Sequence, residues 1–393
     1  MIDYNSVLSS RIQSVQPSGI RRFFDLANSS GLSDIISLSI GEPDFATPWH
    51  IRQAAVDSIE QGRTFYSPNR GFTDLLESIS DYCTRRFGLS YDPHQEILVT
   101  VGGSEAIDCA LRCLVSPGDE VLIPQPSFVC YEPLTIMAGG VPVPIVTEAK
   151  DEFRLTAEAL KQAITPKTKV LVLPFPNNPT GAVMRREHLE EIASVLRDTN
   201  IMILSDEIYC ELTYGDTPHV SIAAIDGMRE RTVIINGFSK SFAMTGWRLG
   251  WAMGPEPVLT QMTKLHQFGI MSAPTTAQYG AMEAMRHGDP DIARMRDEYD
   301  LRRRYIVHRL RTMGLDCFEP EGAFYVFPCI RSTGMTSEEF CTRMIQEEHV
   351  AVVPGSAFGA SGEGFIRISY SYSLKHITEA LDRMERFIAK NKR

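Results

Sequence analysis

The middle of the chain alternates short apolar runs with segments of helical periodicity. Amphipathic stretches such as residues 105–115 and 187–197 separate several of these runs. The seven apolar runs cover residues 97–101, 120–123, 141–146, 170–173, 201–204, 232–235 and 249–253. Apolar strands separated by helices are typical of a largely parallel sheet that helices cover on both faces. We therefore predict an α/β fold with a mostly parallel seven-stranded sheet between helices.

The last hundred or so residues have a different pattern. A long polar helix is expected from about residue 291 to 313, and short strands near 323–328 and 365–370 are mixed with further helices. This mixture favours a smaller α+β domain. We predict an N-terminal arm (1–45) that contributes to the small domain, a large domain (46–290) that carries the site, and a small C-terminal domain (291–393).

Composition and charge narrow the class of partner. Of the 393 residues, 43% are apolar and 22% are charged, as in ordinary folded proteins. The formal net charge of −10 argues against nucleic acid or an anionic membrane as the main partner, because both select a basic face. An anionic substrate would therefore need a local group of arginines or lysines.

Targeting features and cysteine spacing point to the cytoplasm. Residues 1–10 lack the basic and apolar regions of a secretory signal, and no apolar run approaches the ~20 residues that cross a bilayer. The eight cysteines include no Cys-x-x-Cys pair and are best interpreted as small buried apolar residues. We expect a reduced cytoplasmic setting and predict no metal site.

Candidate chemistry lies where the predicted strands end, because ligands of open α/β sheets bind outside the carboxyl ends of the strands. Gly102-Gly103-Ser104-Glu105 follows the first strand and opens a helix, an arrangement that suits a phosphate. By itself such a segment is more often only a turn. It matches neither the dinucleotide fingerprint nor the nucleotide P-loop.

Two further strand ends carry charged residues in apolar surroundings. Asp206 follows a buried run, where a carboxylate is costly unless a cation pairs with it. Lys240 lies just before the apolar residues Phe242, Ala243 and Met244, an unusual setting for a solvated lysine. An enclosed lysine close to Arg248 would have a lowered amine pKa, as Schiff-base chemistry requires. A phosphate site, a nucleophilic lysine, a buried carboxylate and a second cation at one sheet edge are what pyridoxal phosphate needs.

The chain resembles the class I aminotransferases of the aspartate-aminotransferase fold, which use pyridoxal phosphate. The resemblance extends from residues 39–45 to residues 365–369, nearly the whole chain. It rests on three segments that are highly specific together: Asn-Pro-Thr-Gly (178–181), Ser-Asp-Glu-Ile-Tyr (205–209) and the run 239–248 around Lys240. Residues 18–21 and 265–274 resemble a bacterial branch that holds aromatic-amino-acid and N-acetyl-diaminopimelate aminotransferases.

The resemblance implies roles around the cofactor ring. Lys240 matches the lysine that binds the cofactor covalently and later moves the proton, and Asp206 matches the carboxylate that keeps the ring nitrogen protonated. Asn178 and Tyr209 match the pair that hydrogen-bonds the phenolic oxygen of the ring. Phe128 lies where an aromatic side chain stacks on the ring.

The resemblance also implies contacts to the cofactor phosphate. The expected phosphate site comprises Gly103, Ser104, Glu105, Ser239 and Arg248. Many relatives have a phosphate-binding serine three residues before the lysine, whereas this chain has Gly237 there and Ser239 beside the lysine. The phosphate site is therefore the part of the expected site where this chain departs from the pattern of the family.

Other matched residues concern the substrate and the partner subunit. Arg367 resembles the arginine that grips the substrate α-carboxylate with a bidentate fork, and Gly41 lies where the backbone assists it. Tyr66 resembles a tyrosine that reaches the phosphate of the neighbouring subunit, which implies a homodimer with shared active sites. The same relatives predict cis bonds at Gln125–Pro126 and Asn178–Pro179.

The implied activity is transfer of an amino group from an L-amino acid to a 2-oxo acid, such as 2-oxoglutarate, in a ping-pong cycle. A β- or γ-lyase, for instance one that cleaves a C–S bond, shares the same motifs and remains an alternative. A regulator with an enzyme-like domain is a weaker alternative, because the chain is acidic and shows no additional DNA-binding domain.

Substrate specificity is the open part of the sequence argument. Ser104 stands where some dicarboxylate-specific relatives have a lysine, and no arginine occurs between Arg248 and Arg286. We therefore expect a pocket that favours aromatic or other bulky donors, and a dicarboxylate (aspartate) aminotransferase remains an alternative. The expected lining is Ile40, Phe128 and Tyr131 with Phe23 or Phe24, and Arg21, Arg22 or Arg70 is a candidate mobile cation for glutamate.

Overall fold

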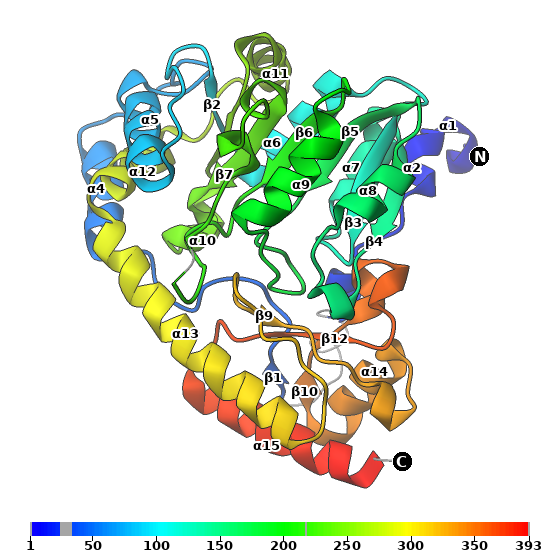
Figure 1. The fold of residues 1–393 in the computed structure, drawn as a ribbon. Coiled ribbons are helices and arrows are strands. Elements are labelled where there is room, and N and C mark those ends of the chain that lie inside the picture. The colour runs from blue at the N-terminus through cyan, green and yellow to red at the C-terminus, as the bar shows by residue number, and fades with distance from the viewer. Residues whose placement is uncertain (1, 24–33, 217, 392–393) are drawn as a thin grey trace.

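The computed structural model describes residues 2–23, 34–216 and 218–391. The seven predicted apolar runs form one sheet of seven strands (Figure 1). In the order in which they lie side by side, these are β2 (Ile97–Thr100), β8 (Gly250–Met253), β7 (Thr232–Gly237), β6 (Met202–Asp206), β5 (Thr168–Leu173), β3 (Glu120–Gln125) and β4 (Val141–Val146). β8 runs in the direction opposite to the other six strands of this sheet. The predicted mostly parallel seven-stranded sheet is confirmed.

Both faces of this sheet are covered. In β7, Ile234 packs into one apolar cluster, whereas Val233 and Ile235 pack into another, because successive side chains of a strand point to opposite faces. One face is covered by α6 (Gly102–Leu114), α7 (Tyr131–Ala138) and α11 (Glu256–Gly269). The other face is covered by α4 (Trp49–Glu60), α5 (Thr73–Phe87), α12 (Thr275–His287), α8 (Ala157–Ala163) and α9 (Arg186–Leu196).

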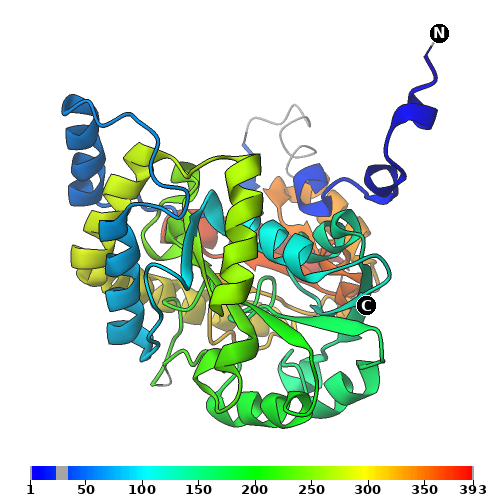
Figure 2. The ribbon, with the colours of Figure 1, turned by 90° about the horizontal axis from the view of Figure 1, so that it is seen from above.

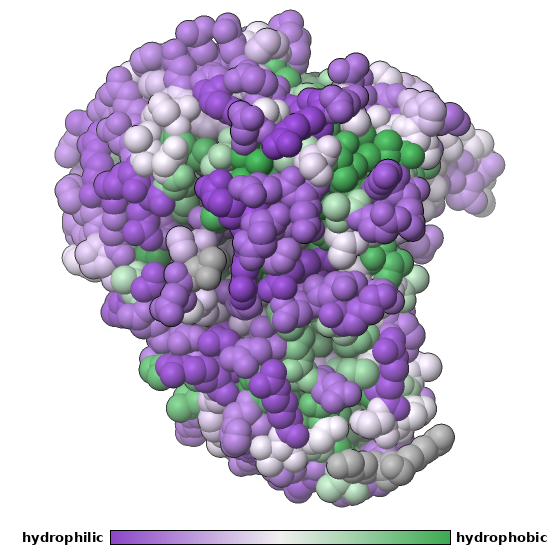
Figure 3. All heavy atoms as spheres, in the orientation of Figure 1, coloured by the Kyte–Doolittle hydropathy of each residue, from purple (hydrophilic) through white to green (hydrophobic). Residues whose placement is uncertain are grey.

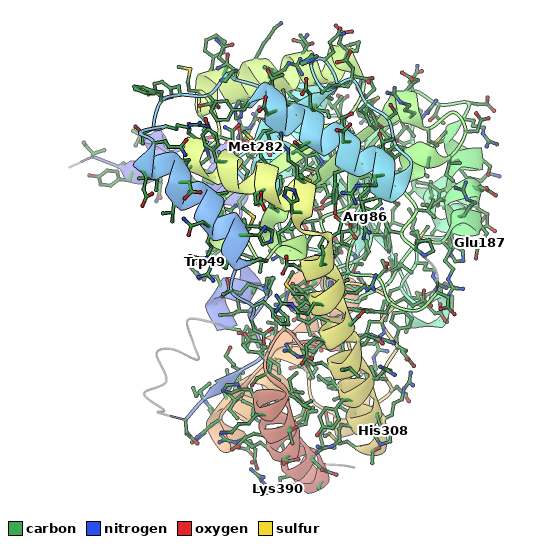
Figure 4. The ribbon with its side chains drawn as sticks, turned by 90° about the vertical axis from the view of Figure 1, so that its left-hand side faces the viewer. Trp49, Arg86, Glu187, Met282, His308 and Lys390 are labelled. Atoms are coloured by element: carbon green, nitrogen blue, oxygen red, sulfur yellow. The ribbon has the colours of Figure 1, made fainter. Side chains whose placement is uncertain are left out.

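A long helix, α13 (Asp289–Thr312), leads from the large sheet into a second layer of elements and runs along one side of the molecule (Figure 1). Figure 4 shows the same side, where α4, α5 and α12 lie next to one another and carry the labelled Trp49, Arg86 and Met282. α13 begins close to the predicted domain boundary at residue 290. The boundaries themselves stay predictions.

The C-terminal elements form a small domain around a short antiparallel sheet. This sheet joins β11 (Val353–Pro354), β12 (Ile366–Ser369) and β9 (Tyr325–Val326), and α14 (Ser337–Glu348) and α15 (Leu374–Asn391) pack with it. β1 (Ile36–Ser37) from the N-terminal part pairs in parallel with β10 (Val350–Ala351). α15 buries one stripe of residues at helical spacing, including Ile377, Leu381 and Met384.

The first residues of the chain lie at the edge of this body and touch α7 through Arg11, whose Nη1 donates to the Met137 carbonyl oxygen at 3.5 Å. The short helices α1 (Tyr4–Val7) and α2 (Ser10–Ser14) project outward in Figure 2 and bury none of their residues. Across the face drawn in Figure 3, hydrophilic residues predominate and hydrophobic residues show as separate patches. Within the described residues, no helix combines the length and the apolar character that crossing a membrane requires.

Two element boundaries shape the site. Helix α6 begins at Gly102, so Gly102 and Gly103 lie in its first turn, as expected for a segment that opens a helix. Strand β6 continues to Asp206, which is therefore the last residue of the strand. The predicted cis bonds at Gln125–Pro126 and Asn178–Pro179 are confirmed, and Phe175–Pro176 is a third.

Candidate active site

A pocket of about 240 Å³ opens at the carboxyl ends of β5 and β6 and the start of α6. All predicted site residues except Glu105 and Tyr66 line it. These are Gly41, Gly103, Ser104, Phe128, Asn178, Asp206, Tyr209, Ser239, Lys240, Arg248 and Arg367. Residues that the sequence argument did not single out complete the lining: Ile20, Ile107, Pro174, Pro176, Ile208, Thr245 and Tyr325.

Lys240 lies on α10 (Phe238–Ser241), the single turn that follows β7. Its Nζ donates a hydrogen bond of 2.6 Å to the carbonyl oxygen of Gly41. Burial lowers the pKa of this amine to about 8, with the nearby charge of Arg367 acting in the same direction and Glu42 opposing it. About a tenth of the amine is therefore neutral and nucleophilic at pH 7, far more than for an ordinary lysine.

Asp206 is a buried carboxylate at the end of β6. Tyr131 donates a hydrogen bond of 2.7 Å to its Oδ2, and the backbone N–H of Ile208 donates to Oδ1 at 3.2 Å. Burial raises the pKa of Asp206, which the bond from Tyr131 partly offsets. A cation bound in the pocket would favour the charged carboxylate, so the site suits a protonated ring nitrogen.

The first turn of α6 and Arg248 together could hold an anion. Gly102 has a φ of +76°, and a Cβ there would lie 2.6 Å from Arg248 Nη2. The glycine thus lets the guanidinium approach the helix start, where free N–H groups favour an anion. Arg248 Nη1 donates to the Thr245 carbonyl oxygen at 2.9 Å, which fixes the side chain at the pocket.

Gly237 stands where many relatives have a phosphate-binding serine, and the structure gives a steric reason for the glycine. Gly237 pairs with Gly250 across β7 and β8, and a Cβ at Gly237 would lie 3.1 Å from Gly250 Cα. A Cβ at Gly250 would in turn lie 2.7 Å from the backbone nitrogen of Gly103. Three backbone segments therefore approach closely here, and the serines that line the pocket are Ser104 and Ser239.

Arg367 is a guanidinium enclosed by protein, with 1% of its surface exposed. Nη1 donates to Asn178 Oδ1 at 2.9 Å and Nη2 donates to the carbonyl oxygen of Ser39, while Nε is buried without a hydrogen-bond partner in the described structure. Its Cζ lies 4.6 Å from the centre of the Tyr325 ring. A buried cation with an unsatisfied donor is suited to a carboxylate.

Glu105 and Tyr66 lie outside the pocket lining. Because α6 starts at Gly102, the Glu105 carboxylate accepts a bond from the Val101 N–H and pairs with His266 Nδ1 at 2.6 Å. The side chain caps and anchors the helix and does not line the pocket, and a cofactor contact by Glu105 stays a prediction. Tyr66 is 83% exposed, so it makes no contact with the pocket of its own chain.

The expected specificity residues are only partly placed at the pocket. Phe128 and Tyr131 line it, whereas Phe23 is buried in the small-domain core and Ile40 is not part of the lining. Phe24 lies outside the described residues. Among the described residues 2–23, Ile20 is the one that lines the pocket.

Comparison with known proteins decides the family. The model of the family "Aminotransferase class I and II" matches residues 33–384. The chain belongs to this family. It is accordingly an aminotransferase that depends on pyridoxal phosphate, as its sequence motifs predicted.

Three relatives illustrate what this aminotransferase is similar to. It is 46% identical to an aromatic-amino-acid aminotransferase 2 of Thermococcus litoralis, over 98% of this chain and 99% of the relative. It is 45% identical to an aspartate aminotransferase of Pyrococcus abyssi, over 98% and 99%. The solved aspartate aminotransferase of Thermus thermophilus with maleate superposes with a TM-score of 0.92 at 36% identity, over 96% and 99%.

The residues of this aminotransferase fit its cofactor. The first turn of α6 with Ser239 and Arg248 could hold the phosphate, Asp206 could pair with the ring nitrogen, and Phe128 could cover the ring. Bound there, pyridoxal phosphate supplies an electron-withdrawing ring for the electrons that a substrate carbon releases. The chain itself supplies an amine with a pKa of about 8 (Lys240), a buried carboxylate (Asp206) and two guanidinium groups (Arg248 and Arg367).

Proposed function

We propose that the enzyme transfers the amino group of an aromatic or otherwise bulky L-amino acid to a 2-oxo acid such as 2-oxoglutarate, in two half-reactions of a ping-pong cycle. Arg367 and Gly41 bind the substrate α-carboxylate and orient its α-carbon. Lys240 Nζ holds the cofactor and moves the proton at that carbon. Asp206 keeps the ring nitrogen protonated, while Asn178 and Tyr209 bind the phenolic oxygen.

The observation that supports a bulky donor is the set of side chains left over for substrate recognition. Every cation among the described lining residues has a role at the common part of the substrate or cofactor: Lys240, Arg248 and Arg367. The remaining lining includes apolar side chains from several elements: Ile20, Ile107, Phe128, Pro174, Pro176 and Ile208. A side-chain carboxylate buried among them would lack a partner, which is unfavourable by several kcal/mol.

Two of the candidate mobile arginines are engaged elsewhere. Arg22 forms an ion pair with Glu338, and Arg70 donates to the carbonyl oxygens of Gln95 and Ile97 at 3.0 and 3.2 Å. Arg21, or a side chain released from one of these contacts, would be needed to admit glutamate as the returning amino donor. The proposed preference for bulky donors therefore concerns kcat/KM, not exclusion of acidic substrates.

Aspartate transamination is the second candidate, because relatives of equal similarity carry that name. Steady-state kinetics with tyrosine, phenylalanine, N-acetyl-diaminopimelate and aspartate against 2-oxoglutarate test the choice. We expect kcat/KM to be at least about tenfold higher for the best bulky donor than for aspartate. A preference for aspartate would contradict the proposal, and product formation without any oxo acid would indicate the lyase alternative.

We also propose a homodimer with shared active sites. Several large apolar side chains on α4, on the segment after it and at the end of α11 are exposed, among them Phe65 (81%), Tyr66 (83%) and Phe268 (87%). These segments adjoin, because Asn69 Nδ2 donates to the Met271 carbonyl oxygen at 2.7 Å. A second copy covering this face would bury the apolar side chains and bring Tyr66 towards the partner's phosphate site.

A cytoplasmic location remains part of the proposal. All eight cysteines lie within the described residues and are free thiols. Thiols that persist unpaired suit a reducing compartment.

A further inference from the structure

Tyr325 is a buried residue of β9 that touches three functional groups at once. Its hydroxyl is 2.7 Å from that of Tyr209, and its ring lies beneath the guanidinium of Arg367. A Cβ at Gly41 would overlap the Tyr325 hydroxyl, so this hydroxyl also lies against the backbone that accepts the bond from Lys240. The side chain fills the space between the substrate arginine and the cofactor tyrosine.

Strand register explains why these groups meet. β9 and β12 are antiparallel, and Tyr325 lies opposite Ser369. Arg367, two residues earlier on β12, points to the same face, so it is the diagonal neighbour of Tyr325. The distance of 4.6 Å between the guanidinium carbon and the ring centre follows from this pairing.

We infer that Tyr325 is a positioning residue: its hydroxyl donates to Tyr209, which directs the proton of Tyr209 towards the cofactor's phenolic oxygen, and its ring supports Arg367. The inference rests on the proposed roles of Tyr209 and Arg367. A tyrosine that accepts one hydrogen bond becomes a stronger donor in the next, because successive bonds polarise one another. The positive charge over the Tyr325 ring favours Tyr325 as the first donor of this chain.

Burial raises the pKa of both tyrosines, so both hydroxyls keep their protons at neutral pH. The positive charge of Arg367 opposes the rise for Tyr325. One hydroxyl proton of the pair forms the hydrogen bond between the two oxygens. The other hydroxyl proton can form a hydrogen bond to a group bound in the pocket. The hydroxyl of Tyr325 thus affects the cofactor, whereas its ring affects carboxylate binding.

Two substitutions separate the two effects. Tyr325→Phe keeps the ring and removes the hydroxyl, and Tyr325→Leu removes both. In the Tyr325→Phe holoenzyme, we expect the pH midpoint of the cofactor's visible absorbance change to rise by roughly half a unit to one unit. The dissociation constant of 3-phenylpropionate, a carboxylate that cannot react, should stay within about twofold, whereas Tyr325→Leu should raise it roughly fivefold.

The matched control is Tyr370→Phe. Tyr370 is also buried, and its hydroxyl donates to the Ala323 carbonyl oxygen at 3.1 Å, but it does not line the pocket. This variant also loses one buried hydroxyl contact, so a general loss of stability would appear in both. We expect it to leave the absorbance midpoint and the 3-phenylpropionate affinity unchanged.

A double-mutant cycle with Tyr209→Phe tests whether Tyr325 acts through Tyr209. We expect Tyr209→Phe to raise the midpoint, and Tyr325→Phe to add nothing in that background. If Tyr209→Phe shifts the midpoint and Tyr325→Phe does not, the inference is overturned while the proposed role of Tyr209 stands. If Tyr209→Phe itself has no effect, the proposed role of Tyr209 fails, and the inference fails with it.

Discussion

Lys240 carries an amine that the fold has largely removed from water, and burial lowers its pKa to about 8. The neutral amine is the nucleophile, so its fraction rises as the pH rises through this pKa. We predict that the rate at which the apoenzyme binds pyridoxal phosphate covalently rises with pH, with a midpoint near 8. Stopped-flow absorbance measures this rate. A midpoint near 10, the ordinary range of lysine, would contradict the account.

Asp206 provides the second prediction at the scale of single residues. The neutral amide of an asparagine cannot hold a proton on the ring nitrogen, so Asp206→Asn should reduce kcat by about a hundredfold or more while the cofactor still binds. Stopped-flow absorbance of the first half-reaction separates this effect from weaker substrate binding. Asp198→Asn, at an exposed residue, is the control. Turnover within about twofold of the unchanged enzyme would refute this role.

The sequence predicted the site residues that lie within recognisable motifs, but it did not predict those that lie in ordinary apolar runs. Lys240, Asp206 and Arg367 are unusual in apolar surroundings, and they meet at one pocket. Tyr325 lies within the run Gly-Ala-Phe-Tyr-Val-Phe (322–327), which is indistinguishable from an ordinary buried strand. Only the register of β9 with β12 shows that this tyrosine faces the site.

At the scale of elements, helix α6 depends on the conformation of its first residue. Gly102→Ala would add a side chain at a φ of +76° and 2.6 Å from Arg248 Nη2. We predict an affinity for pyridoxal phosphate at least about tenfold weaker, measured by titration of the apoenzyme. The displaced guanidinium is the cause, since charge-assisted bonds to phosphate are among the stronger ones.

Gly88→Ala is the matched control for this change. Gly88 ends α5 at a φ of +67°, and a Cβ there would meet nothing within 4 Å. Both variants place alanine in the left-handed region, which costs about 1 kcal/mol, but only one approaches the anion site. Equal cofactor affinities of the two variants would contradict the proposed phosphate site.

The sequence predicted the bounds of the strands to within a few residues, but it did not predict the direction of every strand in the sheet. The seven apolar runs all became strands, because a buried strand needs a continuous apolar stretch. The antiparallel direction of β8 could not be predicted, since an apolar run carries no information on direction. Glycines are poor helix formers, and the close approach of Arg248 explains why Gly102 stands in the first turn of α6.

At the scale of the whole molecule, the exposed apolar face around α4 and α11 leads to a prediction on assembly. The wild-type enzyme should sediment at twice the chain mass of 44.0 kDa. Phe268→Asp should shift the enzyme towards the monomer and reduce activity, because a charge on this face opposes burial against a second copy. Leu301→Asp, at an exposed residue of α13, should leave the dimer intact. A fully active monomer would contradict the shared site.

The central claim is that Lys240 holds the cofactor, and peptide mass mapping after borohydride reduction tests it most directly. Reduction makes the bond between cofactor and lysine permanent, and trypsin then releases the segment 232–248, which contains Lys240 as its only lysine. The account predicts one reduced cofactor per chain, on this peptide alone. A cofactor attached to any other lysine, or full transaminase activity in Lys240→Ala, would contradict it.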